Sequence, residues 1–248
     1  MNASGHRDLL TSLSIAMAPI LELTGVVKHY HGLRPLRVRA LTLSEGEIVA
    51  LAGTDALATE TLTNLITGAT LPDAGSIRVL GEDTAAIADA EAWLRSLDRL
   101  GIVSERAGLL DTLSVRQNIA LPLALDLDDL SPEDAAAVRD LARAVGLEPQ
   151  QLETAAGDAS PVARLRTRLA RALVPAPRLL VLEHPTASIP RAVVPGLASG
   201  FFKLIRDHRC SALVVSADRD FTSDADRELL LDPVTGAARR RGRRAWFS

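Results

Sequence analysis

The sequence has few cysteines, few aromatic residues and little net charge, and each of these features excludes some classes of protein. It holds one cysteine, Cys210, which excludes an internal disulfide and is typical of a reducing compartment. We interpret Cys210 as an unreactive thiol at the edge of a buried strand. Aromatic residues make up 3% of the chain, so a core drawn from the 47% hydrophobic residues consists mainly of Ala, Leu and Val. A formal net charge of -3 gives no overall attraction to nucleic acid, and we expect no nucleic-acid partner.

Long apolar segments are also missing. No run approaches the roughly 20 apolar residues of a membrane-spanning helix. The apolar stretch 9–20 is interrupted by hydroxyl residues and ends at Pro19, which is not typical of a signal peptide. We interpret residues 1–19 as a loosely packed tail or an interfacial helix. The remaining length is enough for one large domain or two small ones.

The sequence does contain apolar strands that alternate with helical segments, which predicts an α/β fold. Residues 20–27 and 36–43 predict the antiparallel strands of a first part of the chain. Further strands are predicted at 47–52, 76–81, 100–103, 179–182 and 212–216, and helices at 61–68, 88–97, 115–125, 132–145, 163–173 and 192–205. The run Leu179–Leu182 is apolar throughout, as in a strand buried on both faces. Residues 229–236 predict the beginning of a closing hairpin.

The chain is organised around one strand–loop–helix unit at residues 46–68. Its strand ends at Gly53, and Leu62, Leu65 and Ile66 share one face of its helix. A phosphate-binding loop lies in such a unit, and it needs glycines, a lysine for the β- and γ-phosphates and a Ser/Thr hydroxyl for Mg²⁺. Many units of this kind bind no ligand, so a structural turn is the alternative.

The loop keeps the first glycine, Gly53, but not the charges that bind a phosphate. Where the pattern requires Gly-Lys-Ser/Thr, the chain has Ala58, Thr59 and Glu60, and Thr61 follows with a hydroxyl. A cation is therefore missing and an anion is added. Two like unit charges about 4 Å apart repel by about 4 kcal/mol at an effective dielectric constant near 20, so Glu60 would repel a phosphate.

Several segments, all in register, resemble the nucleotide-binding domain of ABC transporters. They are VALAGTDALATETLTNLITGATLPDAGSIRVLG, LGIVSERAGLLDTLSVRQNIALPL, ASPVARLRTRLARALVPAPRLLVLEHPTASIP and ALVVSADRD. They follow that family's phosphate loop, its Q-loop region, its signature helix with the Walker B strand and D-loop, and its switch strand. The resemblance covers residues 20–240. It implies a P-loop NTPase-like α/β fold with a parallel-sheet core, an antiparallel β subdomain and a helical subdomain at about 106–172, followed by a basic and aromatic tail at 241–248.

The resemblance also assigns roles to single positions. The implied ATP-site positions are Tyr30, Gly53, Ala58, Thr59, Glu60, Thr61, Glu105 and Ser160. Tyr30 would stack on adenine, although a loop tyrosine packed for structural reasons is the alternative. Thr59 stands at the Walker A lysine, Glu60 at its first Mg²⁺ hydroxyl and Glu105 at the Q-loop glutamine. Of the signature Leu-Ser-Gly-Gly-Gln only Ser160 remains.

The catalytic positions of the family are substituted too. Glu183 stands at the Walker B aspartate, His184 at the catalytic glutamate and Ala217 at the switch histidine. The implied Mg²⁺ ligands are Thr61 and Glu183, and an added Mg²⁺ between Glu60 and Glu183 is a further alternative. Because phosphoryl transfer depends on positioning and charge stabilisation, we expect no catalytic residue and no cofactor. ATP with Mg²⁺ would be the cofactor if binding is retained.

These substitutions predict a catalytically degenerate ABC transporter ATP-binding subunit, a pseudo-ATPase that supports or regulates a membrane transport complex. Two alternatives stay open. One is a divergent active ATPase that uses Glu60, Glu183 and His184, with the neutral imidazole polarising water. The other is a soluble regulator that kept the fold. The subfamilies resembled most are lipid-trafficking (Mla/Mce-like) and lipoprotein-releasing.

The resemblance implies two kinds of partner. A groove at residues 105–123 would receive transmembrane permease subunits, although its leucines also fit an ordinary core. The domain would pair with a second nucleotide-binding domain, identical or different. The expected location is cytoplasmic, peripheral on the inner face of the cell membrane. The basic segment 239–247 would be solvated, or would contact an anionic membrane surface or an acidic patch of a partner.

Overall fold

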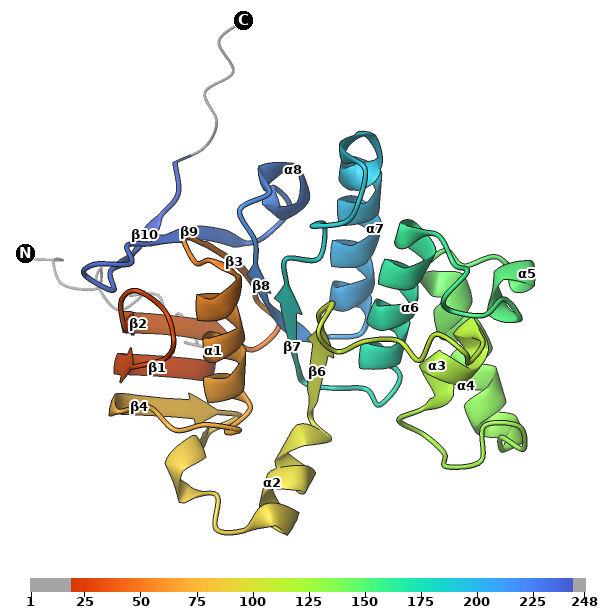
Figure 1. The fold of residues 1–248 in the computed structure, drawn as a ribbon, viewed down its shortest axis with the longest axis horizontal. Helices are drawn as coiled ribbons and strands as arrows, with labels where there is room; N and C mark the ends of the chain where they lie inside the picture. The colour runs from red at the N-terminus through yellow and green to blue at the C-terminus, as the bar shows by residue number, and fades with distance from the viewer. Residues whose placement is uncertain (1–18, 243–248) are drawn as a thin grey trace, which may run out of the picture.

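Residues 19–242 are described by a computed structural model, in which α1 lies between two β-sheets and most other helices lie on the far side of the larger sheet (Figure 1). An antiparallel sheet has the strand order β2-β1-β4-β5, and a larger, mostly parallel sheet has the order β10-β9-β3-β8-β7-β6. The strands are β1 (Pro19–Lys28), β2 (Leu36–Ser44), β3 (Ile48–Ala52), β4 (Ala74–Val79), β5 (Glu82–Asp83), β6 (Leu100–Val103), β7 (Leu179–Glu183), β8 (Ser211–Val215), β9 (Arg227–Leu231) and β10 (Ala238–Arg240). The predicted α/β class is confirmed.

The helices gather mainly at one end of the molecule (Figure 1). They are α1 (Ala56–Ile66), α2 (Ala90–Leu97), α3 (Val115–Ala120), α4 (Pro132–Ala144), α5 (Pro149–Leu152), α6 (Pro161–Leu173), α7 (Val194–Asp207) and α8 (Arg219–Thr222), with short 3-10 turns at Thr84–Ala86 and Arg191–Val193. In the chain, α3 to α6 lie between β6 and β7. None of the helices in residues 19–242 is long and apolar enough to cross a membrane.

Strand β7 joins the two hydrophobic cores. Leu180 and Leu182 face a core shared with α3, α4, α6 and α7, whereas Leu179 and Val181 face a core shared with α1 and the antiparallel sheet. Alternate side chains of a strand point to opposite faces, so an apolar run is what a doubly covered parallel strand requires. The predicted burial of this strand on both faces is confirmed.

Helix α1 was predicted to start near Thr61 but begins at Ala56. The Asp55 side chain accepts a hydrogen bond from the Ala58 backbone N–H at 2.7 Å, which makes Asp55 the N-cap. An aspartate at that position satisfies one of the free N–H groups of the first turn. The predicted apolar face, Leu62, Leu65 and Ile66, is fully buried.

Other element ends differ from the prediction by a few residues. Helix α3 ends at Ala120, two residues before Pro122, which has no N–H to donate to a helix, whereas we predicted helix as far as 125. Helix α4 confirms the predicted Ser131 cap with proline in the first turn. Pro19, which we placed in the N-terminal tail, begins β1. The tail residues 1–18 and 243–248 lie outside the described residues.

Cys210 directly precedes β8 and is buried. Burial raises the pKa of its thiol to about 12. Since the thiolate is the reactive form, this cysteine is unreactive at neutral pH. That agrees with its interpretation as a structural thiol.

Candidate functional site

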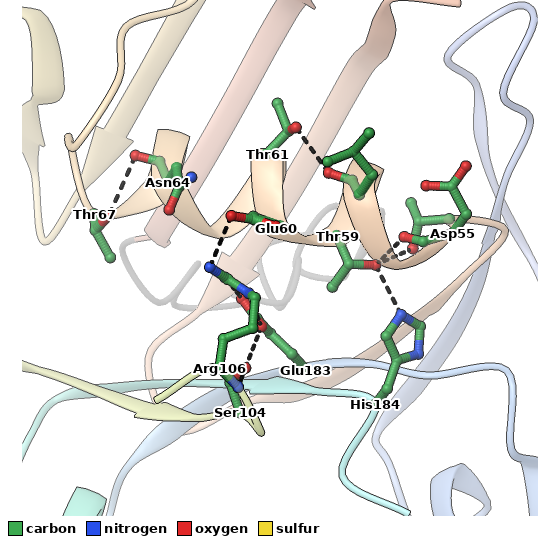
Figure 2. Close-up of polar contacts among 12 residues, drawn as sticks. Asp55, Thr59, Glu60, Thr61, Asn64, Thr67, Ser104, Arg106, Glu183 and His184 are labelled. Atoms are coloured by element: carbon green, nitrogen blue, oxygen red, sulfur yellow. Dashed lines mark hydrogen bonds and ion pairs between the residues drawn. The ribbon is translucent and has the colours of Figure 1, made fainter. Parts of the chain in front are cut away.

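The candidate site lies where the carboxyl ends of three parallel strands meet the start of α1 (Figure 2). Strand β3 leads into Gly53, β6 leads into Ser104, and β7 ends at Glu183 with His184 next. The carboxyl edge of a parallel sheet is where α/β proteins bind their ligands. The structure therefore brings the Walker A and Walker B positions to one edge.

Gly53 has a structural reason to be glycine that is independent of any ligand. Its φ is +99°, and a Cβ at this position would lie 2.2 Å from the carbonyl oxygen of Leu231 in β9. Only glycine combines that backbone conformation with such a close approach. The retained glycine is thus explained by the packing of β9 against the loop.

The N-terminus of α1 already holds a carboxylate of the chain, that of Asp55. The first turn of a helix attracts anions because its N–H groups are free and its dipole is positive there. A phosphate would have to compete with the Asp55 carboxylate for these groups and would be repelled by it. Our sequence analysis missed Asp55, although an aspartate directly before a helical segment is a recognisable N-cap signal.

Thr59 and His184 contact each other directly. The Thr59 Oγ1 lies 3.0 Å from Nε2 of His184, 2.9 Å from Oγ1 of Thr54 and 2.8 Å from the Asp55 carbonyl oxygen (Figure 2). Thr59 is buried, and His184 has the unusual φ of +41°. The positions that the resemblance equates with the Walker A lysine and the catalytic glutamate are therefore joined to each other.

The hydrogen bonds of Thr59 favour one tautomer of His184. The Thr59 hydroxyl has one hydrogen, and it donates that hydrogen to the carbonyl oxygen of Asp55. Toward His184 it acts as an acceptor, so Nε2 is the donor. While Nε2 carries this proton and donates it to Thr59, that nitrogen cannot take a proton from water.

Arg106 is a site residue that the sequence analysis missed. Its Nη1 lies 3.1 Å from Oε1 of Glu60, and its Nη2 and Nε lie 2.6 and 3.1 Å from Oε1 and Oε2 of Glu183 (Figure 2). We expected Glu60 and Glu183 to approach each other and considered Mg²⁺ between them. In the structure, both carboxylates contact the guanidinium of Arg106. The signal in the sequence was an arginine directly after Glu105 in the Q-loop region.

Glu183 is ionised in this arrangement although only 6% of its side chain is exposed. Burial raises the pKa of Glu183, but hydrogen bonds from Arg106 and Ser104, together with the charge of Arg106, outweigh burial and lower the pKa below its usual value. The Ser104 hydroxyl donates to Oε2 of Glu183 at 2.5 Å. A buried carboxylate with these partners is stable as an anion.

Thr61 and Glu183, which we named together as magnesium ligands, do not come together. The Thr61 hydroxyl donates to the Leu57 carbonyl oxygen within α1 at 2.8 Å and points away from Glu183 in Figure 2. Across residues 19–242, no group of three or more His, Cys, Asp or Glu side chains is placed to hold a metal ion. The intrahelical bond of Thr61 follows from its place in the second turn of α1, on the face away from β7.

Of three other predicted site positions, two make local contacts and the third has no polar side chain. Ser160 caps α6 by accepting from the Ala163 N–H at 3.2 Å. Glu105 accepts a hydrogen bond from the Ser188 hydroxyl, which ties the Q-loop position to the segment after β7. Ala217 follows β8 and is exposed, with no side-chain nitrogen or oxygen to offer.

Tyr30 borders a hollow of about 270 Å³ beside the start of α1. Gly53, Asp55 and Ala58 line the same hollow. Partial burial raises the pKa of Tyr30, and the charge of Asp55 raises it further, so the phenol is neutral. Leu57, the neighbour of Ala58 in α1, is not among the residues that line the hollow.

The segment 105–123 is held against α6 by arginines. Arg171 donates to the carbonyl oxygens of Ala107 and Gly108, and Arg164 pairs with Asp111 at 2.8 Å. Leu109 is buried, whereas 51% of the Leu110 side chain is exposed. One of these leucines therefore belongs to the core and the other lies at the surface, and the docking of a permease at this segment stays a prediction.

The family of the chain follows from its match to known proteins. The model of the ABC transporter family matches residues 36–187, more than half of the chain. The chain belongs to the ABC transporter family. The lipoprotein-releasing system ATP-binding protein LolD of Pseudomonas fluorescens is 32% identical over 192 residues, which are 77% of this chain and 83% of LolD. The ABC transporter ATP-binding protein YxdL of Bacillus subtilis is 29% identical over 205 residues, which are 82% of this chain and 79% of YxdL.

Solved structures of ATP-binding cassettes share the fold of this ABC family member. The dimeric, post-hydrolysis structure of the cassette MJ0796 bound to ADP and Pi superposes with a TM-score of 0.74 at 21% identity, covering 90% of this chain and 99% of that one. CbiO1 from Clostridium perfringens, part of the ABC transporter complex cbiONQ, gives 0.75 at 19% identity, covering 89% and 87%. The predicted cassette fold is confirmed.

A magnesium triphosphate does not fit the phosphate end of this site as the chain fills it. The Asp55 carboxylate is at the helix N-terminus, and Thr59 touches His184. Arg106 lies between Glu60 and Glu183. The positions that would neutralise phosphates are occupied by the carboxylate of Glu60 and by contacts within the chain.

Proposed function

We propose that this ABC family member is a cassette subunit that does not hydrolyse ATP and that supports or regulates a membrane transport complex. One observation carries the proposal: the direct contact between Thr59 and His184. In active members of the family the corresponding positions hold the lysine and the glutamate that act on the γ-phosphate and the attacking water. Here the two side chains bind each other, so Nε2 of His184 is engaged by Thr59 and is not free to act on water.

A divergent active ATPase is the second candidate, and the contacts of the site argue against it. It would need Glu60, Glu183 and His184 free to act on a metal ion and water. Both carboxylates are bound to Arg106, and His184 donates to Thr59. Removing one donor from a site that stabilises developing charge costs about 3–4 kcal/mol of transition-state stabilisation, and this chain has replaced several such groups.

The proposed partners are transmembrane permease subunits that dock at residues 105–123, and a second nucleotide-binding domain, identical or different. The exposed Leu110 supports the docking surface. The relatives named LolD favour a lipoprotein or lipid as the cargo of the complex. In this proposal the chain is peripheral on the cytoplasmic face of the cell membrane.

Calorimetric titration of the full chain with ATP, with and without Mg²⁺, tests the proposal together with a phosphate-release assay. We expect no Mg²⁺-dependent binding and a release rate equal to that of the protein-free blank. His184→Ala should leave both results unchanged. Tight Mg²⁺-dependent binding with turnover that His184→Ala reduces would establish the active ATPase instead.

Co-purification tests the membrane partner. We expect the tagged chain to recover proteins with several membrane spans from detergent-solubilised membranes of its own host. Leu110→Asp should lose them. Leu125→Asp is the control, because Leu125 is exposed to an even greater extent than Leu110 but lies outside residues 105–123. Recovery from the soluble fraction alone would favour the soluble regulator.

A further inference from the structure

The acidic centre of the site is built around a positive group that belongs to the chain. Glu60 comes from α1 and Glu183 from the end of β7, and the guanidinium of Arg106 lies between them. Each of its three nitrogens has a carboxylate oxygen within 3.1 Å, and the pairing with Glu183 is bidentate. The Arg106 backbone N–H also donates to Ser104 Oγ at 3.1 Å. Main chain and side chain of Arg106 are thus both fixed to this centre.

We infer that Glu60, Glu183 and Ser104 form a cation site whose resident cation is the Arg106 side chain. A hard divalent cation such as Mg²⁺ or Mn²⁺ enters this site only when Arg106 is removed. The inference rests on the proposed function, because it explains why the chain needs no metal ion there. Carboxylate and hydroxyl oxygens are the ligands that these ions take.

Burial distinguishes this centre from an ordinary surface ion pair. Glu183 is 6% exposed, whereas Glu60 and Arg106 are 38% and 42% exposed. A buried carboxylate needs a positive partner, because water cannot solvate it. Two carboxylates and one guanidinium leave one net negative charge, so removing Arg106 leaves two. A divalent cation would then neutralise the centre.

The resident cation also fixes the chain that follows it. Arg106 lies in the loop after β6, at the beginning of the segment 105–123. Its ion pairs join this segment to Glu60 of α1 and to Glu183 of β7. Side chains of the chain itself therefore help to set the position of the proposed docking surface.

Metal titration of full-length variants tests the inference. We expect Arg106→Ala to melt at a lower temperature than the wild type and to recover part of the loss in millimolar MgCl₂, with no such effect on the wild type. Electron paramagnetic resonance of Mn²⁺ should show binding to Arg106→Ala at least about tenfold tighter than to the wild type, the scale of effect that partners of a metal site commonly have. The double variant Arg106→Ala, Glu60→Gln should lose both effects.

A matched control separates this site from a general effect of losing an arginine. Arg227 makes a similar bidentate pair with the half-buried Glu47, away from the site. Arg227→Ala should also destabilise the protein, but Mg²⁺ should not rescue it. If Arg106→Ala does not fold, Arg106→Gln carries the same expectation in the Mn²⁺ titration.

Two results would overturn the inference. One is a wild type that binds Mn²⁺ as tightly as the variants do. The other is a folded Arg106 variant that binds no Mn²⁺. Neither result touches the proposed function, which the phosphate-release assay and the co-purification test separately.

Discussion

Thr59 and His184 are joined by a hydrogen bond of 3.0 Å between Oγ1 and Nε2, so the residue after β7 closes directly onto α1. Thr59→Val keeps the shape of the side chain and removes the hydroxyl. The partly buried Nε2–H of His184 then loses its acceptor, and we expect a loss of about 1 kcal/mol of unfolding free energy. Urea denaturation measures this.

Thr112→Val is the control for the Thr59 variant. Thr112 is exposed and follows Asp111 in a loop. We expect its unfolding free energy to change by less than about 0.5 kcal/mol. Equal losses for the two variants would mean that the Thr59–His184 hydrogen bond contributes nothing to stability.

Two glycines with positive φ make a matched pair. Gly53→Ala places a Cβ 2.2 Å from the Leu231 carbonyl oxygen, whereas Gly46→Ala meets nothing within 4 Å although φ is +74° there. Gly46→Ala should cost about 1–2 kcal/mol through backbone conformation alone. Gly53→Ala should cost clearly more, because the backbone of β9 must also move. Thermal melts of both variants compare these costs, and equal shifts would contradict the packing explanation.

Asp55 should stabilise α1 as its N-cap. Asp55→Ala removes the acceptor for the Ala58 N–H, and we expect it to cost about 1 kcal/mol. Asp55→Asn keeps an acceptor oxygen and should cost less. Chemical denaturation of the three proteins gives the ranking, and a loss as large for asparagine as for alanine would show that charge, not capping, is what matters.

The lowered pKa of Glu183 predicts a pH dependence of stability. Below the usual glutamate pKa of about 4.3, the unfolded chain binds a proton that the folded chain does not yet take up. The contribution of Glu183 is therefore complete above that pH and is lost as pH falls through the lower, folded pKa. Melting temperature should fall with acid more steeply in the wild type than in Glu183→Gln. Parallel curves would contradict an ionised Glu183.

Most of the fold could be predicted from the sequence because its signals are local. The apolar run of β7 and the alternation of β2 depend on a few adjacent residues and their period. The start of α1 at Ala56 was not predicted, although Asp55 directly before it is a local N-cap signal. The comparison with a phosphate loop assigned the same residues to a loop.

The candidate site was predictable only in part. The substituted positions Thr59, Glu60, Glu183 and His184 could be read from the sequence, and the structure does bring them to one edge. The sequence alone does not show which of these side chains bind each other. Arg106 is 46 residues from Glu60 and 77 from Glu183, so only the folded sheet shows that its charge is shared between them.

The two-sided packing of β7 has a consequence for how this protein comes apart. Successive residues of β7 pack into opposite hydrophobic cores. Unfolding of either core therefore exposes leucine or valine side chains of β7 and displaces the strand from the other core. On heating, the helices and both sheets should therefore unfold in one cooperative transition. Near- and far-ultraviolet circular dichroism should then change at the same temperature.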